Sequence, residues 1–295
     1  MKSDAVAFPL VRSRAADFVA LTKPRLNLLV VATSAAGYYL GTSSDLDYAR
    51  FASTVLGTAL VAGGASALNQ VYERRPDALM RRTRLRPLPD GRLQPGEASR
   101  FALLLSLAGL LLLALGANLL AAMVALVTLV TYVACYTPLK SRSSLATVVG
   151  AVPGALPPMI GWAGATEVLS REAWILFAIV FLWQMPHFLA IAWLYRDDYA
   201  RAGFPMLPVV EPDGRSTARQ VVAYAAALLP VSLAPTAVGL TSPMYFVGAL
   251  ALGAAFLALA IRFARSRGRS DARWLFVGSI LYLPLVWILM IATRT

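Results

Sequence analysis

The chain has 295 residues, of which 58% are hydrophobic and only 14% are charged, and its mean hydropathy is +0.65. So large an apolar fraction excludes a soluble globular enzyme and predicts an all-α polytopic membrane protein. The net charge of +12 comes from basic residues in short loops between apolar runs, which fits membrane topology and anionic lipid rather than nucleic acid. The single cysteine, Cys135, excludes disulfides within the chain and thiolate metal clusters.

Nine apolar segments follow one another along the chain, and each is expected to be a helix because only helices and closed barrels satisfy the backbone in lipid. We expect one integral-membrane domain over residues 1–295, with a cytoplasmic N-terminal segment at about 1–25 that lacks a removable signal peptide. Pro and Gly residues interrupt the fifth segment, which predicts an irregular helix beside the functional site. The expected spans are 26–42, 51–75, 100–116, 118–138, 146–165, 173–195, 219–239, 243–262 and 273–292.

The distribution of basic residues predicts the orientation. Of the 27 Lys and Arg residues, 24 precede the first span or follow an even-numbered span, and only Arg50, Arg171 and Arg294 lie on the other side. This asymmetry predicts a cytoplasmic N-terminus, a periplasmic C-terminus and a site that faces the cytoplasm. The lack of a transit peptide favours a bacterial inner membrane over an organelle.

The first candidate site lies where the second apolar segment ends. Asn69, Glu73 and Asp77 are spaced four residues apart, which places them on one helical face, and three oxygen donors suit a hard cation such as Mg²⁺. Basic residues after a span often serve orientation alone, but orientation does not explain three oxygen donors on one face. The stretch therefore predicts a metal-bridged phosphate site. Arginines surround it at positions 74, 75, 81, 82, 84 and 86.

A second acidic pair, Asp197 and Asp198, ends the sixth apolar segment on the same predicted side. Two acidic clusters at one membrane face predict two Mg²⁺ ions held against a diphosphate, with all five oxygen donors as metal ligands. The basic residues expected to neutralise the departing diphosphate are Arg74, Arg82, Arg86, Lys140 and Arg142. For Lys140 and Arg142 a simple topological anchor is an equal alternative.

His187 is the only histidine in the chain and lies within the sixth segment, in Trp183-Gln-Met-Pro-His-Phe. A lone histidine in a helix usually forms a hydrogen bond within the packed interior. An ionisable side chain inside a membrane span is nevertheless a candidate for function. Both interpretations stay open for His187 at this point.

Several motifs together resemble a known family. Asn69-x3-Glu73-x3-Asp77 is similar to the first Asp-rich motif of the UbiA-type intramembrane prenyltransferases. Further stretches are similar to the haem O synthase branch of that family, and the resemblance covers about residues 20–215. They are Met80-Arg-Arg-Thr-Arg-Leu-Arg-Pro-Leu-Pro, Tyr136-Thr-Pro-Leu-Lys, residues 150–164, Trp183-Gln-Met-Pro-His-Phe and Asp198-Tyr-x-x-Ala-Gly-Phe-Pro-Met-Leu-Pro-Val-Val.

The resemblance implies a nine-helix bundle that transfers farnesyl from farnesyl diphosphate to a vinyl group of protoheme (haem B), with Mg²⁺ as the cation. It also implies haem or acceptor contacts from His187, Trp183 and Tyr136, and a haem A synthase or oxidase assembly protein as a possible partner. Aromatic rings such as those of Tyr72, Tyr136 and Trp183 suit a farnesyl carbocation, which their π faces stabilise.

The chain departs from the family pattern at four positions. Glu73 stands where Asp is commoner, Arg75 and Arg201 stand where relatives often carry an acid, and Pro76 is expected to break the helix beside Asp77. These departures leave the exact ligand set open. Two other functions also remain: a prenyltransferase with an aromatic acceptor such as a hydroxybenzoate, and a transporter. The transporter is disfavoured because, His187 apart, the charges cluster at the ends of the segments.

Overall fold

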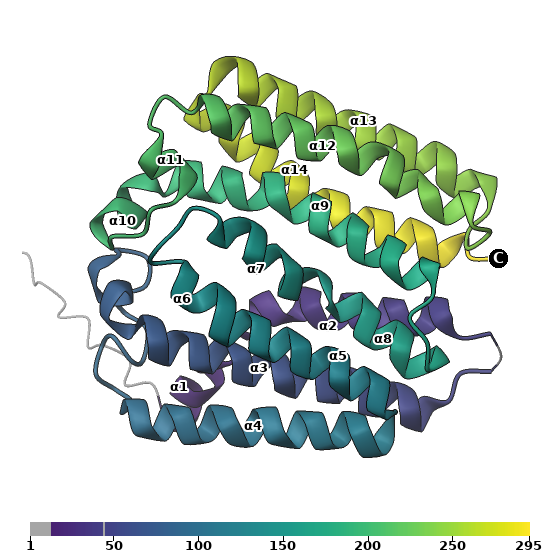
Figure 1. Ribbon diagram of the computed structural model, residues 1–295, viewed down its shortest axis with the longest axis horizontal. Coiled ribbons are helices and arrows are strands. Elements are labelled where there is room, and N and C mark those ends of the chain that lie inside the picture. The colour runs from purple at the N-terminus through teal and green to yellow at the C-terminus, as the bar shows by residue number, and fades with distance from the viewer. Residues whose placement is uncertain (1–12, 44) are drawn as a thin grey trace, which may run out of the picture.

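The computed structural model describes residues 13–43 and 45–295 (Figure 1), so residues 1–12 of the predicted N-terminal segment lie outside the described residues. Within the described part, the regular structure is helical apart from an isolated antiparallel bridge between Thr241 and Arg294. The predicted all-α class is confirmed.

The long helices coincide with the apolar segments, because each apolar run supplies close to the 20 residues that a membrane span needs. The uninterrupted ones are α2 (Pro24–Gly41), α3 (Tyr48–Leu79), α4 (Pro95–Gly116), α9 (Arg171–Leu194), α12 (Arg215–Ala237), α13 (Pro243–Ser266) and α14 (Arg269–Ala292). Two segments are composite: α5 (Leu119–Val130), the π-helix η1 (Thr131–Tyr136) and α6 (Thr137–Leu139), and then α7 (Ala146–Ala155) and α8 (Pro157–Thr166). Three short helices complete the set: α1 (Arg14–Leu21), α10 (Arg196–Arg201) and α11 (Leu207–Val210).

Eight segments of residues 13–43 and 45–295 are long and apolar enough to cross a membrane. The first expected span, 26–42, forms the 18-residue helix α2, which packs against α3 and α8 but is not one of the eight. Polar side chains such as Asn27, Thr33 and Ser34 lower its hydropathy. The protein therefore has several membrane spans, and their number of nine stays a prediction.

The fifth predicted span is irregular, as expected. It breaks at Leu156, between α7 and α8, where Pro157 and Pro158 begin the second helix. Proline lacks the backbone donor that would continue the helical hydrogen bonds of the preceding turn. Small residues then allow α8 to approach α2 closely, since a Cβ atom on Gly161 would collide with the carbonyl oxygen of Ser34.

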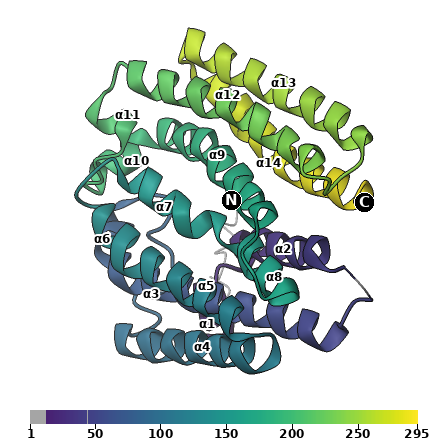
Figure 2. The same cartoon turned by 45° about the vertical axis from the view of Figure 1, so that its right-hand side comes forward.

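Figures 1 and 2 both show the long helices side by side, with α4 at one outer edge of the bundle and α13 at the other. The loops that follow α3 and α6 lie at the same end as α10 and α11. At the opposite end, Arg50 forms an ion pair with Glu167 (Nη2 to Oε1, 2.5 Å), and Arg294 donates to the carbonyl of Tyr39 (2.6 Å). The few basic residues expected on the far side are therefore separated from the acidic motifs.

Candidate active site

The first acidic motif lies on the last turns of α3. Asn69, Glu73 and Asp77 are all buried, with 3%, 3% and 0% of their surface exposed. The expected helix break at Pro76 is wrong, because α3 continues through Pro76 to Leu79. Proline near a helix end removes only one backbone bond, and the turn that follows is short. The motif therefore stays in helical register up to its last member.

Glu73 is the centre of a polar cluster. The Lys140 ammonium donates to both carboxylate oxygens of Glu73, at 3.1 and 2.9 Å, and the Asn69 amide donates to one of them at 3.0 Å. Burial disfavours the charged form of Lys140, but the Glu73 carboxylate outweighs burial and raises the pKa of Lys140. The pair joins the end of α3 to the segment that follows α6.

The Asn69 side chain links three elements through both of its ends. Its oxygen accepts from the Lys23 ammonium at 3.2 Å, and its nitrogen donates to the Thr137 hydroxyl at 3.2 Å as well as to Glu73. Thr137 in turn donates to the carbonyl of Tyr132 at 2.8 Å. The amide is thus held in one orientation, with its oxygen toward a cation.

Lys23 is a candidate site residue that the sequence did not predict. It precedes Pro24 with a φ of 48°, a left-handed conformation that is strained for a residue with a side chain. This conformation accompanies the placement of its ammonium beside Asn69. Burial, reinforced by the nearby Arg86 guanidinium, lowers the pKa of Lys23 to about 7. The sequence feature that could have pointed to Lys23 is the Lys23-Pro24 pair just before an apolar run.

Asp77 occupies the other half of the site. One carboxylate oxygen accepts from Arg86 at 2.6 Å, and the Asp77 carbonyl accepts from the Thr83 hydroxyl at 2.8 Å, which folds the following loop back onto α3. The second carboxylate oxygen, Oδ1, is buried and has no hydrogen-bond partner among residues 13–43 and 45–295. A buried oxygen without a partner is costly unless a cation or donor binds it.

These donors fit a magnesium ion. Mg²⁺ is commonly held by one or two protein carboxylates together with phosphate oxygens of the substrate. Nowhere in the described ranges do three His, Cys, Asp or Glu side chains converge as a metal cluster. Glu73, Asp77 and the Asn69 amide oxygen are therefore the protein donors gathered at the end of α3, and the unpartnered oxygen of Asp77 suits a cation.

The other predicted diphosphate ligands are placed differently. Arg74 donates to the carbonyl of Val71 at 2.9 Å, and the Arg82 guanidinium lies 5.3 Å from the centre of the Tyr195 ring. Arg142 is exposed and, within the residues that the structure describes, forms no ion pair. Arg86 and Lys140 are thus the predicted basic residues that contact the first acidic motif.

The second acidic motif is on α10, and in the part of the chain that the structure describes no ion pair joins its carboxylates to the first motif. Asp197 is exposed and lies 3.9 Å from Arg196, while Asp198 pairs with Arg201 one turn further along the same helix. The short helix is nevertheless anchored at the end of α3, because Tyr199 and Phe204 belong to a buried apolar cluster with Met80.

The α10–α11 segment also closes over the first motif. The Lys140 ammonium lies 4.6 Å from the centre of the Phe204 ring, a cation–π contact. Phe204 is 2% exposed, so this face of the ammonium is shielded from water. The elements that carry the two motifs are therefore neighbours, while the joint binding of metal by their carboxylates stays a prediction.

The π-helix η1 places aromatic rings beside the polar cluster. The Tyr132 and Tyr136 rings lie 5.3 Å apart, and Tyr136 packs against Gly150 of α7. The wider turn of a π-helix often marks a functional site. Here it brings Tyr132, Tyr136 and Thr137 to the same end of the composite span, next to Asn69.

His187 and Trp183 both face α14. His187 Nδ1 lies 2.7 Å from the Ser279 hydroxyl, and the Trp183 indole donates to the Ser279 carbonyl at 2.8 Å. Ser279 uses its one hydroxyl hydrogen on the carbonyl of Phe276, so the imidazole Nδ1 is the donor in its bond to Ser279. The histidine ring also stacks on Trp183, with the ring centres 5.1 Å apart. This geometry is that of a packed, hydrogen-bonded histidine.

Comparison with known proteins identifies the family of the chain. A profile of the UbiA prenyltransferase family matches residues 30–288. A protoheme IX farnesyltransferase from Solibacter usitatus is 50% identical over 287 residues, which cover 94% of this chain and 98% of the relative. A protein of the same name from Koribacter versatilis is 43% identical and covers 99% of this chain and 97% of its own length.

Solved structures show the same fold at low sequence identity. A digeranylgeranylglyceryl phosphate synthase superimposes with a TM-score of 0.80 at 14% identity, covering 95% of this chain and 98% of the other. A UbiA homologue from Archaeoglobus fulgidus, bound to GPP and Mg²⁺, gives a TM-score of 0.64 at 15% identity, covering 93% of this chain and 99% of the other. From the family profile and the full-length relatives, the chain belongs to the UbiA prenyltransferase family and is a prenyltransferase.

Proposed function

We propose that the protein transfers a farnesyl group from farnesyl diphosphate to a vinyl group of haem B, which yields haem O. The observation that carries the proposal is the buried face of Asn69, Glu73 and Asp77 with three cations around it, Lys23, Lys140 and Arg86. The names of the full-length relatives support the farnesyl donor and the haem acceptor.

The oxygen donors of Asn69, Glu73 and Asp77 would hold Mg²⁺, with Asp197 and Asp198 as further ligands once the diphosphate is present. When bound, Mg²⁺ supplies charge neutralisation to the diphosphate oxygens. Lys140 donates to the Glu73 carboxylate and Lys23 donates to the Asn69 amide oxygen. We infer that these two ammonium groups transfer their hydrogen bonds to the diphosphate.

The reaction needs no protein nucleophile. The allylic C1–O bond of farnesyl diphosphate breaks, and its electron pair leaves with the diphosphate, where Arg86, Lys23 and Lys140 stabilise the negative charge. Arg74, Arg82 and Arg142 would add to the positive charge that Arg86, Lys23 and Lys140 provide. The π electrons of the haem vinyl group then form the new C–C bond to farnesyl C1.

Water completes the product by adding its oxygen to the cation left on the haem side chain and releasing one proton to solvent. The allylic cation must survive until the vinyl group reaches it, so the site excludes water earlier. Tyr132 and Tyr136 offer π faces beside the cluster, and Phe204 covers Lys140 from the loop side. Of the predicted acceptor contacts, Tyr136 is the one that lies beside the acidic motif.

The charge distribution supports placing this site at the cytoplasmic face of a bacterial inner membrane. The loops after α3, α6 and α9 carry the basic residues and lie at one end of the bundle (Figure 2). Positive residues are retained on the cytoplasmic side of membrane proteins. A haem A synthase or an oxidase assembly protein remains the proposed partner, since the product haem must leave the bilayer-bound enzyme for another protein.

The test is an assay of the purified protein with haem B, farnesyl diphosphate and Mg²⁺, with the porphyrin product measured by mass. We expect a hydroxyethylfarnesyl haem from the wild type, and none from Asp77→Asn. His187→Ala should retain the product with lower thermal stability, because His187 packs against α14. Loss of haem turnover in a stably folded His187→Ala would assign His187 to the haem. Prenylation of a hydroxybenzoate in place of haem would retain the family and refute the acceptor.

A further inference from the structure

Two of the three cations around the first acidic motif come from separate segments of the chain. Lys23 lies between α1 and α2, and Arg86 lies in the loop of residues 80–94 between α3 and α4. The Lys23 ammonium contacts Asn69 at 3.2 Å, and the Arg86 guanidinium contacts Asp77 at 2.6 Å. The contacts that hold these two segments therefore determine where both cations lie.

A buried ion pair joins α1 to this loop. Arg92 Nε donates to both carboxylate oxygens of Asp17, each at 3.1 Å. Asp17 is 2% exposed, and a carboxylate so deeply buried needs a cation and hydrogen bonds to offset its lost hydration. The Arg92 guanidinium also pairs with Asp90 of its own loop. The Asp17–Arg92 pair belongs to neither acidic motif and to none of the groups assigned above to metal or diphosphate.

The same guanidinium fixes the backbone next to Arg86. Arg92 Nη2 donates to the carbonyl of Leu85 at 3.2 Å. The Arg92 backbone amide donates to the carbonyl of Pro87 at 2.9 Å, and the Asp90 amide donates to the carbonyl of Arg86 at 3.0 Å. The residues on both sides of Arg86 are thus bound to Arg92, which limits the positions that the Arg86 side chain can take.

On the other side of the pair, the end of α1 is held just before Lys23. The Gln70 side chain of α3 donates to the carbonyl of Leu21, the last residue of α1, at 2.7 Å. Leu21 is fully buried. Asp17 lies in the first turn of this eight-residue helix. The helix is therefore fixed at both ends, and Lys23 begins its left-handed turn from a fixed point.

The loop and α1 also share an apolar cluster. It comprises Leu21 of α1, Leu88 and Leu93 of the loop, Ala67 of α3, and Ala98 and Ala102 of α4. Apolar contacts are non-directional, so they bring the segments together without fixing the direction of a cationic side chain. Hydrogen bonds from a planar guanidinium are directional. The Asp17–Arg92 pair therefore supplies an orientation that the apolar cluster does not.

We propose that Asp17 and Arg92 are positioning residues that set Lys23 and Arg86 for the diphosphate of the prenyl donor. Asp17 acts on Lys23 through α1. Arg92 acts on both cations, because it also binds the loop beside Arg86. Each residue acts through a neighbour rather than on the substrate. The inference rests on the proposed function for the roles of Lys23 and Arg86 at the diphosphate, and it is independent of the acceptor.

The experiment measures how farnesyl thiolodiphosphate, an analogue that ionises slowly, binds with Mg²⁺ to the full chain in lipid nanodiscs. Isothermal titration calorimetry gives the dissociation constant. Asp17→Asn keeps the shape of the side chain and removes its charge, and it should weaken binding about fivefold because Lys23 is no longer held in place. In a Lys23→Met background the same substitution should change the dissociation constant by less than about twofold, since Asp17 acts through Lys23.

Arg92→Lys is the second variant. It keeps a cation beside Asp17, but a single ammonium lacks the fork that reaches Asp17 and the Leu85 carbonyl together. It should therefore weaken binding about fivefold in the Lys23→Met background as well, through Arg86. Unchanged binding in that background would overturn the part of the proposal that concerns Arg86.

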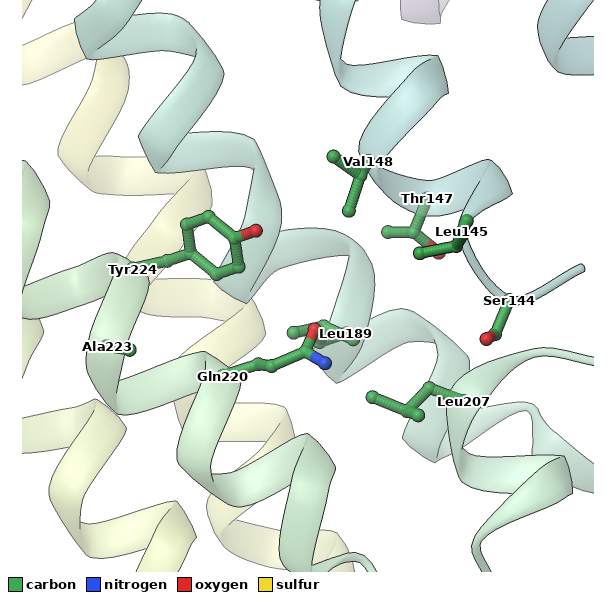
Figure 3. Close-up of a pocket in the computed structure, with 9 residues that line it drawn as sticks. All are labelled: Ser144, Leu145, Thr147, Val148, Leu189, Leu207, Gln220, Ala223 and Tyr224. Carbon is green, nitrogen blue, oxygen red and sulfur yellow. The ribbon is translucent and has the colours of Figure 1, made fainter.

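Two control variants change polar contacts elsewhere. Arg14→Gln removes an ion pair between α1 and Glu97 of α4 (2.7 Å), but the Arg14 side chain is 69% exposed, and exposed pairs contribute little. Tyr224→Phe removes a hydroxyl from a groove of about 380 Å³ that is lined by α7, α9, α11, α12 and the loop before α7 (Figure 3). The helix α1 packs against α3 and α4 instead. Both controls should bind the analogue like the wild type.

Three results would overturn the proposal. The first is equal affinity of the wild type and Asp17→Asn, including the case in which thermal stability falls, because the pair would then serve folding alone. The second is a full loss of affinity on adding Asp17→Asn to Lys23→Met, because Asp17 would then act by another route. The third is a loss of the same size in Arg14→Gln or Tyr224→Phe.

Failure of this inference is distinguishable from failure of the proposed function. The binding measurement needs no acceptor, so it holds whether the wild type prenylates haem or a hydroxybenzoate. If the wild type binds the analogue and Asp17→Asn binds it equally well, the positioning role is refuted and the function stands. If the wild type does not bind the analogue with Mg²⁺ at all, both proposals fall together.

Discussion

The two acidic motifs lie at one end of the bundle but differ in how they are built. Glu73 and Asp77 project from a long helix into a buried cluster that joins α3 to Lys23 before α2 and to Lys140 after α6. Asp197 and Asp198 sit on a six-residue helix and pair with arginines of that same helix. The first motif is organised by hydrogen bonds and ion pairs, whereas the second is held near it by apolar packing and by the cation–π contacts of Arg82 and Lys140.

This difference separates two tasks. Preorganised charge is the efficient way to stabilise a leaving group, because no reorganisation is needed as charge develops. The second task is to close over the site after the substrate has entered, which a separate short segment can do. Tyr199 and Phe204 anchor α10 beside Met80, so the second motif lies at the end of α3. We therefore expect ionisation to depend on the first motif far more than on the second.

The largest expected effect comes from Asp77→Asn compared with Asp197→Asn. Asp77 is buried with one unpartnered oxygen, so its loss should lower kcat/KM roughly a thousandfold, about 4 kcal/mol of transition-state stabilisation. Asp197 is exposed, and its loss should cost about tenfold or less. Steady-state rates with farnesyl diphosphate measure both. Equal losses in the two variants would break the distinction between the motifs.

Lys140→Met should have the next largest effect. Removing the ammonium leaves the Glu73 carboxylate buried and without its main partner, which should cost about 3 kcal/mol of stability and roughly a hundredfold in rate. Thermal unfolding in detergent measures the first quantity. Adding Glu73→Gln to Lys140→Met removes the uncompensated charge, so stability should return while activity does not. Recovery of both would mean that Lys140 serves structure alone.

Much of this end of the protein was predictable from the sequence, and the reasons for the rest are physical. The spacing of Asn69, Glu73 and Asp77 predicted one helical face, since a period of 3.6 residues is a local property of the chain. Lys23 was not predicted as a site residue, because its role depends on a left-handed backbone that brings it to a residue 46 positions away. No sequence period encodes such a contact.

The fold also has features that follow from the local sequence and features that depend on distant contacts. The apolar runs predicted the long helices and the break near Pro157, because both follow from local composition. The continuation of α3 through Pro76 was missed, since proline tolerance depends on how close the helix end lies. The helices α10 and α11 are placed by packing between distant segments, which leaves no periodic signal in the sequence.

Thr137→Val tests whether the first motif is preorganised. The Thr137 hydroxyl accepts from Asn69 and donates to the Tyr132 carbonyl, so it fixes the orientation of the amide without contacting substrate. Its loss should raise the Mg²⁺ concentration for half-maximal rate about tenfold, and leave the maximal rate at saturating Mg²⁺ nearly unchanged. Manganese binding followed by electron paramagnetic resonance should weaken in parallel. Thr137→Ser should behave like wild type, and failure of that rescue would assign Thr137 to packing.

Arg201→Gln, with the smallest expected effect, tests whether Asp198 of α10 joins the metal site when the diphosphate is bound. It frees Asp198 from its intrahelical partner, and an exposed ion pair contributes at most about 1 kcal/mol, so stability should hardly change. If Asp198 joins the metal site only when the diphosphate is bound, the free carboxylate should lower the Mg²⁺ requirement two- to threefold, roughly 0.5 kcal/mol. Arg196→Gln, beside the exposed Asp197, is the matched control and should change nothing. A higher Mg²⁺ requirement in Arg201→Gln would instead show that the arginine itself contacts the diphosphate, and Arg201 rather than Asp198 would then be the residue of α10 that acts on the substrate.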